Sequence, residues 1–160
     1  MTRLDIDLAA QCAELRDARG ATLRRYPISS SRNGPGERQG SYCTPRGLHV
    51  IRAKIGAGRP LNTVFVRRRP TGEIYSPDMA AQYPDRDWIL TRILWLSGCE
   101  VGFNRLGDVD TMRRFIYIHG TPDSVALGRS GSIGCIRMHN NDLLDVFEGV
   151  SVGDSVLIHE

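Results

Sequence analysis

Short segments with the two-residue period of a β-strand dominate the sequence and restrict what it can fold into. Leu48–Ile55 and Thr63–Arg68 alternate apolar and polar residues, which is typical of strands with one buried face. Other strand-like runs predict further strands, at Glu14–Arg16, Thr22–Ile28, Phe115–His119 and Ser155–His159. Asp87–Leu96 has a length that suits a helix, but its Ile, Thr and Trp content favours a strand. We therefore expect a mainly β fold, built as a sandwich or a barrel.

One segment predicts a helix with its own end signals. Asn140 or Asn141 can cap a helix over Asp142–Glu148, and Gly149 can end it. The polar, glycine-rich segment Ser29–Ser41 predicts a surface loop, since no independent core fits before it.

Composition sets the domain number and excludes several classes of protein. The 160 residues, 41% of them hydrophobic, suit a single domain over residues 1–160. A net charge of +3 gives little support for a nucleic-acid partner, and we expect none. Two acids within Met1–Asp7 interrupt any signal-peptide pattern, and apolar stretches such as Ile93–Leu96 are too short to span a membrane. Lys54 is the single lysine and lies outside any phosphate-binding motif, so no cofactor is predicted.

The cysteines lie far apart and form no Cys-x-x-Cys pair, which argues against a zinc ribbon or a thioredoxin-type site. They are Cys12, Cys43, Cys99 and Cys135. The even count permits disulfides, but one free working thiol would leave three cysteines that cannot all pair.

Other polar residues are expected to have structural roles or to face solvent, and not to take part in catalysis or metal binding. Two acidic pairs are expected in solvated loops and predict no metal site: Asp85 with Asp87, and Asp108 with Asp110. The basic run Arg67-Arg68-Arg69 is expected at a solvated strand end. His49, inside a strand, is expected to be a packing or surface residue.

The segment Ile116–Met138 carries the residues that could perform chemistry. His119 leaves a strand, and Cys135 follows sixteen residues later, directly after Gly134. A thiol becomes a strong nucleophile when a base or cation favours the thiolate. A glycine before it lets successive backbone N–H groups point at one developing oxyanion. From residue types alone, a catalytic pair and a buried structural cysteine with a core histidine both remain open.

The residue pattern of this segment resembles that of the L,D-transpeptidase catalytic domain (the YkuD family). The matching residues are His119-Gly120-Thr121 and Ser132 with Gly134-Cys135-Ile136-Arg137-Met138, and Thr44-Pro45-Arg46-Gly47 resembles the family's entry to a central strand. The resemblance implies a β-sandwich of mixed sheets with one or two short helices. It also implies that the chain acts on peptidoglycan stem peptides.

The resemblance assigns roles to the matching residues. Cys135 would attack the carbonyl of the third, L-centred residue of a tetrapeptide stem, with release of D-Ala, and His119 would take the thiol proton. Backbone N–H groups around Gly134 would hold the oxyanion. Arg137 would bind a carboxylate of the substrate or hold its loop. Ser132, Ile133 and Gly120 would line or shape the substrate site, with Gly120 also positioning His119.

Ile133 departs from the family pattern, which has a histidine immediately before Gly-Cys. Isoleucine cannot hydrogen-bond or carry a proton, so altered activity or pH dependence is expected. Transfer to an amine acceptor is the first interpretation, by 3-3 crosslinking or D-amino-acid exchange. Alternatives are an L,D-carboxypeptidase or wall-targeting effector with water as acceptor, and a non-catalytic peptidoglycan-binding module. The resemblance further implies carbapenem-type inhibitors and action in the periplasm or cell envelope, and a monomer is expected.

Overall fold

A single mixed sheet runs through most of the chain. In the computed structural model, which describes all 160 residues, ten strands belong to this sheet. They are β1 Arg3–Asp7, β2 Cys12–Arg16, β3 Thr22–Pro27, β4 Gly47–Ile55, β5 Thr63–Val66, β6 Arg69–Ile74, β7 Ile89–Gly98, β8 Tyr117–Gly120, β9 Ile136–Met138 and β10 Ser155–His159. The helices are α1 Pro77–Gln82, α2 Asn140–Gly149 and the 3-10 turn Gly107–Val109.

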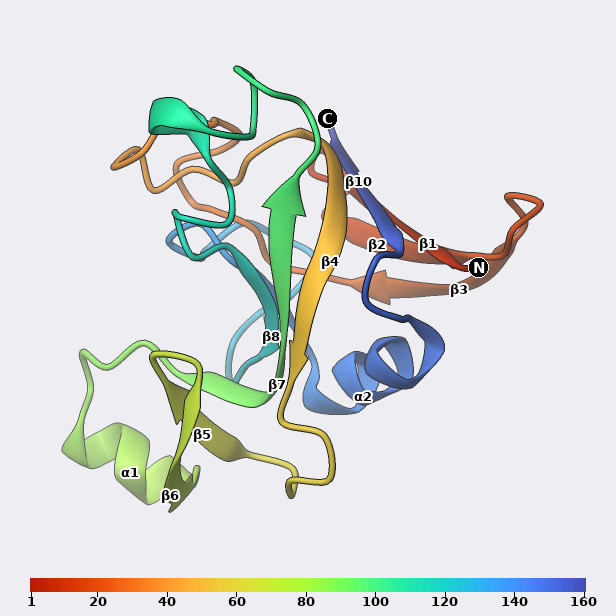
Figure 1. Ribbon diagram of the computed structural model, residues 1–160. Helices are drawn as coiled ribbons and strands as arrows, with labels where there is room; N and C mark the ends of the chain where they lie inside the picture. Colours follow the sequence, from red (N-terminus) through yellow and green to blue (C-terminus); the bar gives the residue numbers. More distant parts are fainter.

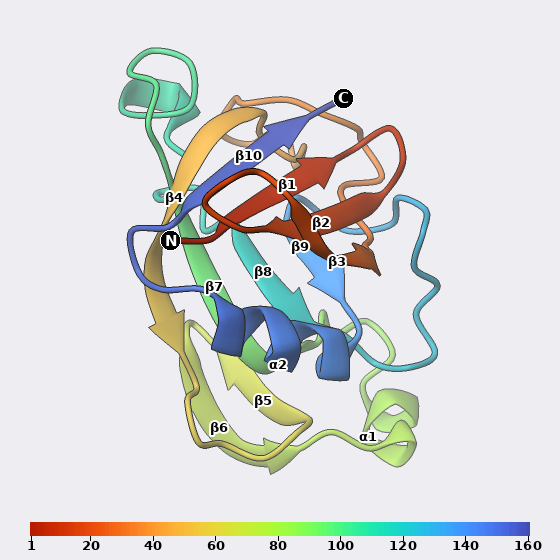
Figure 2. The same cartoon turned by 90° about the vertical axis from the view of Figure 1, so that its right-hand side faces the viewer.

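The sheet folds over on itself around one core (Figures 1 and 2). Its main path is β3-β2-β1-β10-β4-β7-β5-β6, and β8 and β9 continue from the other edge of β7. Two pairs are parallel, β1 with β10 and β8 with β9. The free edge of β9 is covered by Ser29, whose N–H donates to Arg137 and whose carbonyl accepts from it, at 3.0 and 2.9 Å. The sheet is thereby nearly closed.

The inward face of the folded sheet carries the main core. Twenty buried hydrophobic residues form one cluster, among them Ile118, Ile136 and Met138 of β8 and β9. Helix α2 closes one end of this core with Leu143 and Val146, both fully buried (Figure 2). Burying each such side chain contributes about 1.5–3 kcal/mol, so the register of the short strands is enforced by their inward residues.

The mainly β prediction is confirmed, with corrections in detail. The strands β1, β6 and β9 and the helix α1 were not anticipated. Ser29–Ser41 is not simply a surface loop, since its first three serines are buried and pair with the motif segment. The cap of α2 is also different. Asn140 is already helical, and its side chain faces inward to Thr91 and Thr121.

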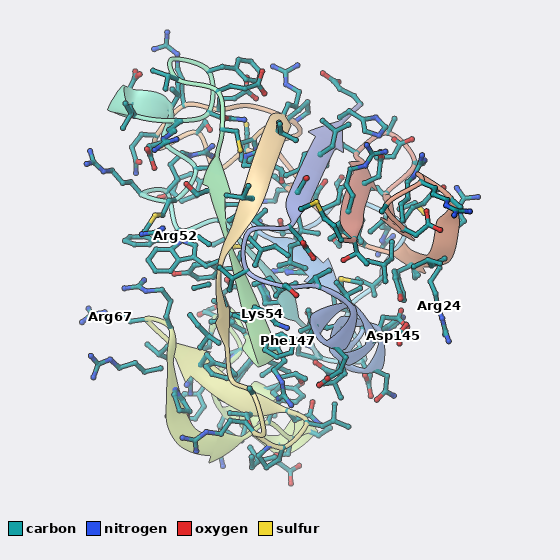
Figure 3. The ribbon with its side chains drawn as sticks, turned by 45° about the vertical axis from the view of Figure 1, so that its right-hand side comes forward. Arg24, Arg52, Lys54, Arg67, Asp145 and Phe147 are labelled. Carbon is teal, nitrogen blue, oxygen red and sulfur yellow. The ribbon has the colours of Figure 1, made fainter.

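The single lysine holds the end of α2. A bulge in β4 at Arg52 shifts the strand by one residue, so Arg52 faces outward while Lys54 pairs opposite Leu94 and faces inward. Lys54 Nζ donates to the carbonyls of Phe147 and Val150 at 2.6 and 2.7 Å. The ammonium also lies 4.3 Å from the centre of the Phe147 ring (Figure 3). These last-turn carbonyls would otherwise lack partners.

No helix of the structure has both the length and the apolar character needed to cross a membrane.

The variant Lys54→Met is expected to lower the free energy of unfolding by about 1.5–3 kcal/mol, the usual contribution of hydrogen bonds to a charged group. Arg24→Met is the matched control. It removes an exposed ion pair of 3.6 Å to Asp145 on the same helix, which should contribute less than about 1 kcal/mol. Urea unfolding of both variants measures the difference, and equal losses would contradict the capping role.

Candidate active site

The outward face of β7, β8 and β9 carries the candidate catalytic residues. Ile118 pairs with Ile136 and His119 pairs with Arg137, so Cys135, one residue earlier, lies beside Tyr117. Side chains alternate along a strand. Since Ile118 and Ile136 face the core, Cys135, Arg137 and His119 project from the opposite face of adjacent strands. The sequence could not give this register, which brings the predicted nucleophile and base together.

The Cys135 thiol rests in a protonated state. Its sulfur accepts a hydrogen bond from the Tyr117 amide at 3.3 Å and donates to the Phe115 carbonyl at 3.4 Å. Burial raises the pKa of Cys135 to about 12, although the Tyr117 amide and the charge of Arg137 lower it. At neutral pH Cys135 is therefore a thiol, and a nucleophilic role would require a base to remove its proton before attack.

His119 has the protonation state that a base requires. It is 1% exposed, and burial lowers the pKa of its imidazole below the ordinary value, so the ring is neutral at pH 7. Nδ1 lies 2.7 Å from the Gly120 carbonyl, which places the proton on Nδ1 and leaves Nε2 as an acceptor. The thiol currently points its proton at Phe115, so transfer to His119 requires rotation of the Cys135 side chain.

The turn before Cys135 is held by its own side chains. Gly134 has φ of +131°, a conformation that favours glycine. Ser132 Oγ accepts from the Gly134 amide at 3.2 Å and donates to the Cys135 carbonyl at 2.5 Å. Thr44 Oγ1 donates to the Gly134 carbonyl at 2.9 Å. Ser132 thus shapes the turn, and the Cys135 amide keeps no protein acceptor.

Gly120 and Arg137 fix the surroundings of His119. A Cβ atom at Gly120 would overlap the Asn140 side chain and the Leu90 carbonyl, so only glycine fits there. Arg137 donates to the Gly131 carbonyl at 3.2 Å and to Asp87 at 3.1 Å. The expectation that Asp87 belongs to a solvated loop missed this ion pair, because nothing local in the sequence links residues fifty positions apart.

A cavity of about 420 Å³ opens beside Cys135. Ile133, 43% exposed, contributes an apolar wall where a histidine would be polar. His119 and Ser132 do not line the cavity. Its other lining residues were not predicted as site residues, and they include Tyr42, Arg67, Arg68, Asp87, Arg114 and Tyr117.

Two arginines at the tip of the β5–β6 hairpin form part of this cavity. Arg67 and Arg68 have φ of 50° and 65°, so both residues of the two-residue turn are left-handed, where asparagine and glycine are usual. Arg68 donates to the Tyr117 hydroxyl at 2.9 Å and lies over the Trp95 and Phe115 rings. Arg67 projects without a protein partner (Figure 3). The basic run therefore lies where β5 ends and β6 begins, with Arg67 and Arg69 exposed as expected for a solvated strand end, and Arg67 and Arg68 also line the cavity beside Cys135.

All four cysteines are free thiols, and no cluster of His, Cys, Asp and Glu side chains is arranged to hold a metal.

The rate of Cys135 alkylation by iodoacetamide is expected to rise about tenfold per pH unit between pH 7 and 9.5. The thiolate fraction grows by that factor while the pH stays below the pKa. Peptide mapping by mass spectrometry identifies the labelled cysteine, and reduced glutathione serves as a reference whose rate levels off near its ordinary thiol pKa of about 8.5. A plateau for Cys135 below pH 8 would contradict the protonated resting state.

Comparisons with known proteins agree with this arrangement. A family model described as the L,D-transpeptidase catalytic domain (YkuD) matches residues 1–158. YqjB of Bacillus subtilis (strain 168), whose name marks it as a candidate L,D-transpeptidase, is 41% identical over 58 residues, covering 36% of this chain and 31% of YqjB.

Solved structures of L,D-transpeptidases share the fold. The enzyme from Xylanimonas cellulosilytica DSM 15894 superposes with a TM-score of 0.62 and 16% identity, covering 99% of this chain and 60% of the other. L,D-transpeptidase 3 from Mycobacterium tuberculosis, in complex with a faropenem-derived adduct, gives 0.60 and 17%, with coverage of 99% and 60%. This chain thus spans only part of the length of these relatives. It belongs to the YkuD family of L,D-transpeptidase catalytic domains.

Proposed function

We propose that this chain is a cysteine acyltransferase of the L,D-transpeptidase type, acting on peptidoglycan stem peptides. The observation that carries the proposal is the parallel pairing of β8 with β9. This pairing sets the Cys135 thiol and the neutral His119 ring on one face of adjacent strands, with Cys135 open to a cavity. The chain forms one domain over residues 1–160, built around a single main core, and works as a monomer.

The reaction has two steps that share one thioester. His119 Nε2 takes the thiol proton as Cys135 Sγ attacks the carbonyl carbon of the third stem residue. The bond to the fourth residue then breaks, and its amine leaves as D-Ala with the proton that His119 returns. An acceptor amine next attacks the thioester carbon, loses a proton to His119, and releases the thiolate, which regains that proton.

Neighbouring groups supply charge stabilisation in this mechanism. The Cys135 amide, free of protein acceptors, is the better oxyanion donor, because the Gly134 amide already donates to Ser132. The Arg137 guanidinium lies on the same face and can bind a substrate carboxylate. That carboxylate would compete with Asp87 for the guanidinium. Ile133 provides apolar contact at the cavity wall, and Gly120 holds His119 in place.

The substrate class locates this activity in the periplasm or cell envelope, where peptidoglycan lies. Carbapenem-type β-lactams are expected to acylate Cys135. The faropenem-derived adduct in the Mycobacterium tuberculosis relative supports that expectation.

A second candidate function is favoured by Ile133. An exposed isoleucine beside a thiol with a pKa of about 12 would also suit a module that binds peptidoglycan without turning it over. Hydrolysis, with water as the acceptor, is a further alternative. The incubation with and without a D-amino acid described below distinguishes it from transfer to an amine.

Incubation with a disaccharide-tetrapeptide and a D-amino acid is expected to give the exchanged product, detected by mass spectrometry. Cys135→Ala should abolish product and the carbapenem adduct, and His119→Ala should lower the rate by about 10²–10⁴, as expected for a lost general base. Cys12→Ala and His159→Gln, which lie outside the cavity, are the matched controls. Release of the free tripeptide without the added D-amino acid would indicate a carboxypeptidase, and an adduct that survives in Cys135→Ala would refute the nucleophile.

Restoring the family histidine tests whether His119 is the sole base. Ile133→His is expected to change the rate or the pH profile only modestly, because Cys135 needs one proton acceptor and a second imidazole can only tune the first. The pH dependence of the initial rate is the measurement. If the wild type is inert with the tetrapeptide and with a carbapenem, and Ile133→His creates activity, the binding module is the correct function.

A further inference from the structure

A second cavity, of about 580 Å³, lies on the same outward face of the sheet as Cys135. Val50 and Arg52 of β4 and the end of β7 form its floor, and the loop between β7 and β8 forms its walls. Trp95 packs against Phe115 and Tyr117 of the first cavity, and its indole N–H donates at 3.1 Å to the carbonyl of Met112, which lines the second. None of the residues in the motif that contains His119 and Cys135 lines this second cavity.

Three arginines line this cavity without protein partners. Arg52, Arg105 and Arg113 make no side-chain hydrogen bond and no ion pair within 4 Å. Asp110 is the single acidic residue in the lining. Its carboxylate accepts hydrogen bonds from the backbone amides of Leu106 and Arg113 at 2.6 and 2.9 Å. Three cations therefore face one carboxylate that is already hydrogen-bonded, which leaves an excess of positive charge around the cavity.

Arg52 stands at the bulge in β4 and lines this cavity. Ile51 pairs with Leu96 and Ala53 pairs with Trp95, so Arg52 is the extra residue and remains on the outward face. Figure 3 shows Arg52 projecting from the side of the sheet that also carries Arg67, away from α2. Bulges commonly redirect a side chain near a functional site.

The loop that carries the other two arginines is fixed by buried polar groups. Asn104 is fully buried, and its amide donates to the carbonyls of Arg46 and Leu48 at 3.0 and 3.1 Å. Thr111, also fully buried, lies 2.9 Å from the ring of His49. A satisfied buried network of this kind rigidifies its segment. Arg105 and Arg113 are therefore presented from a preformed loop, so a ligand meets little ordering cost there.

We propose that this cavity binds the phosphate group of a small molecule or lipid. Guanidinium groups match phosphate oxygens through paired hydrogen bonds, and three of them arriving from separate segments suit a tetrahedral, multiply charged oxyanion. The volume exceeds that of a phosphate alone, and Val50 and Met112 give the remainder of the ligand an apolar contact. Cys99 can report on occupancy because it is one of the residues that line this cavity.

Calorimetric titration of the whole chain with inorganic pyrophosphate at low ionic strength tests this site. One equivalent is expected to bind, with affinity reduced about tenfold or more by Arg52→Gln, Arg105→Gln or Arg113→Gln, since each removes charge-assisted hydrogen bonds. Arg19→Gln, in the exposed β2–β3 turn, removes the same charge elsewhere and should bind like the wild type. Circular dichroism verifies that each variant is folded.

Cysteine labelling gives a second measurement of binding that is independent of calorimetry. Saturating pyrophosphate should slow the alkylation of Cys99 several-fold and leave Cys12 unchanged. A parallel arm uses vesicles with and without phosphatidylglycerol. Binding of pyrophosphate assigns the site to soluble phosphates, and binding only to the anionic vesicles assigns it to a lipid headgroup. Binding to neither, equal weakening by Arg19→Gln, or protection of Cys135 in place of Cys99 would overturn the proposal.

Discussion

The pairing of β8 with β9 determines where every reacting group lies. The two strands are short, and their inward residues Ile118, Ile136 and Met138 are fully buried in the main core. A slip of one residue would expose these side chains and turn Cys135 toward the core, at a cost of about 1.5–3 kcal/mol for each apolar side chain. The hydrophobic core thus fixes the geometry of the outward face, although it contributes no atom to the chemistry.

Irregular positions in the central strand β7 and its neighbour β4 adapt this scaffold to its function. Thr91 has φ of 76°, an outlier for a β-branched residue, at the bulge where β7 meets β8. Its hydroxyl donates to Asn140 at 2.7 Å, which in turn packs against Gly120 beside His119. Backbone strain of this kind persists only where surrounding contacts over-determine it, and it clusters at functional sites. The β4 bulge likewise turns Lys54 toward α2, whereas regular alternation would leave this residue on the outward face.

Local sequence patterns were enough to predict most of the strands and the motif around Cys135, but not the tertiary contacts of the site. Alternation identified β4 and β5, the Ile, Thr and Trp content of Asp87–Leu96 favoured a strand at β7, and the glycine turn identified Cys135. The inward position of Lys54 depends on one inserted residue, which a period-two pattern cannot register. Asp87 belongs to the site only through its ion pair with Arg137, and Arg67 only because a hairpin folds over the outward face. These relations are tertiary, and no spacing in the chain encodes them.

In the proposed mechanism, the electrostatic state of the site allows a chain with Ile133 to remain active. Burial raises the pKa of the Cys135 thiol and lowers that of the His119 imidazole, so transfer of the proton from Cys135 to His119 before substrate arrives is unfavourable. The resting thiol is consequently protected from adventitious reaction. Once a carbonyl carbon lies against the sulfur, bond formation and proton transfer proceed together, and the oxyanion donors offset the cost. A second histidine at position 133 would bias the proton but would not replace Nε2 of His119 as its acceptor, since only His119 is fixed by the β8–β9 register.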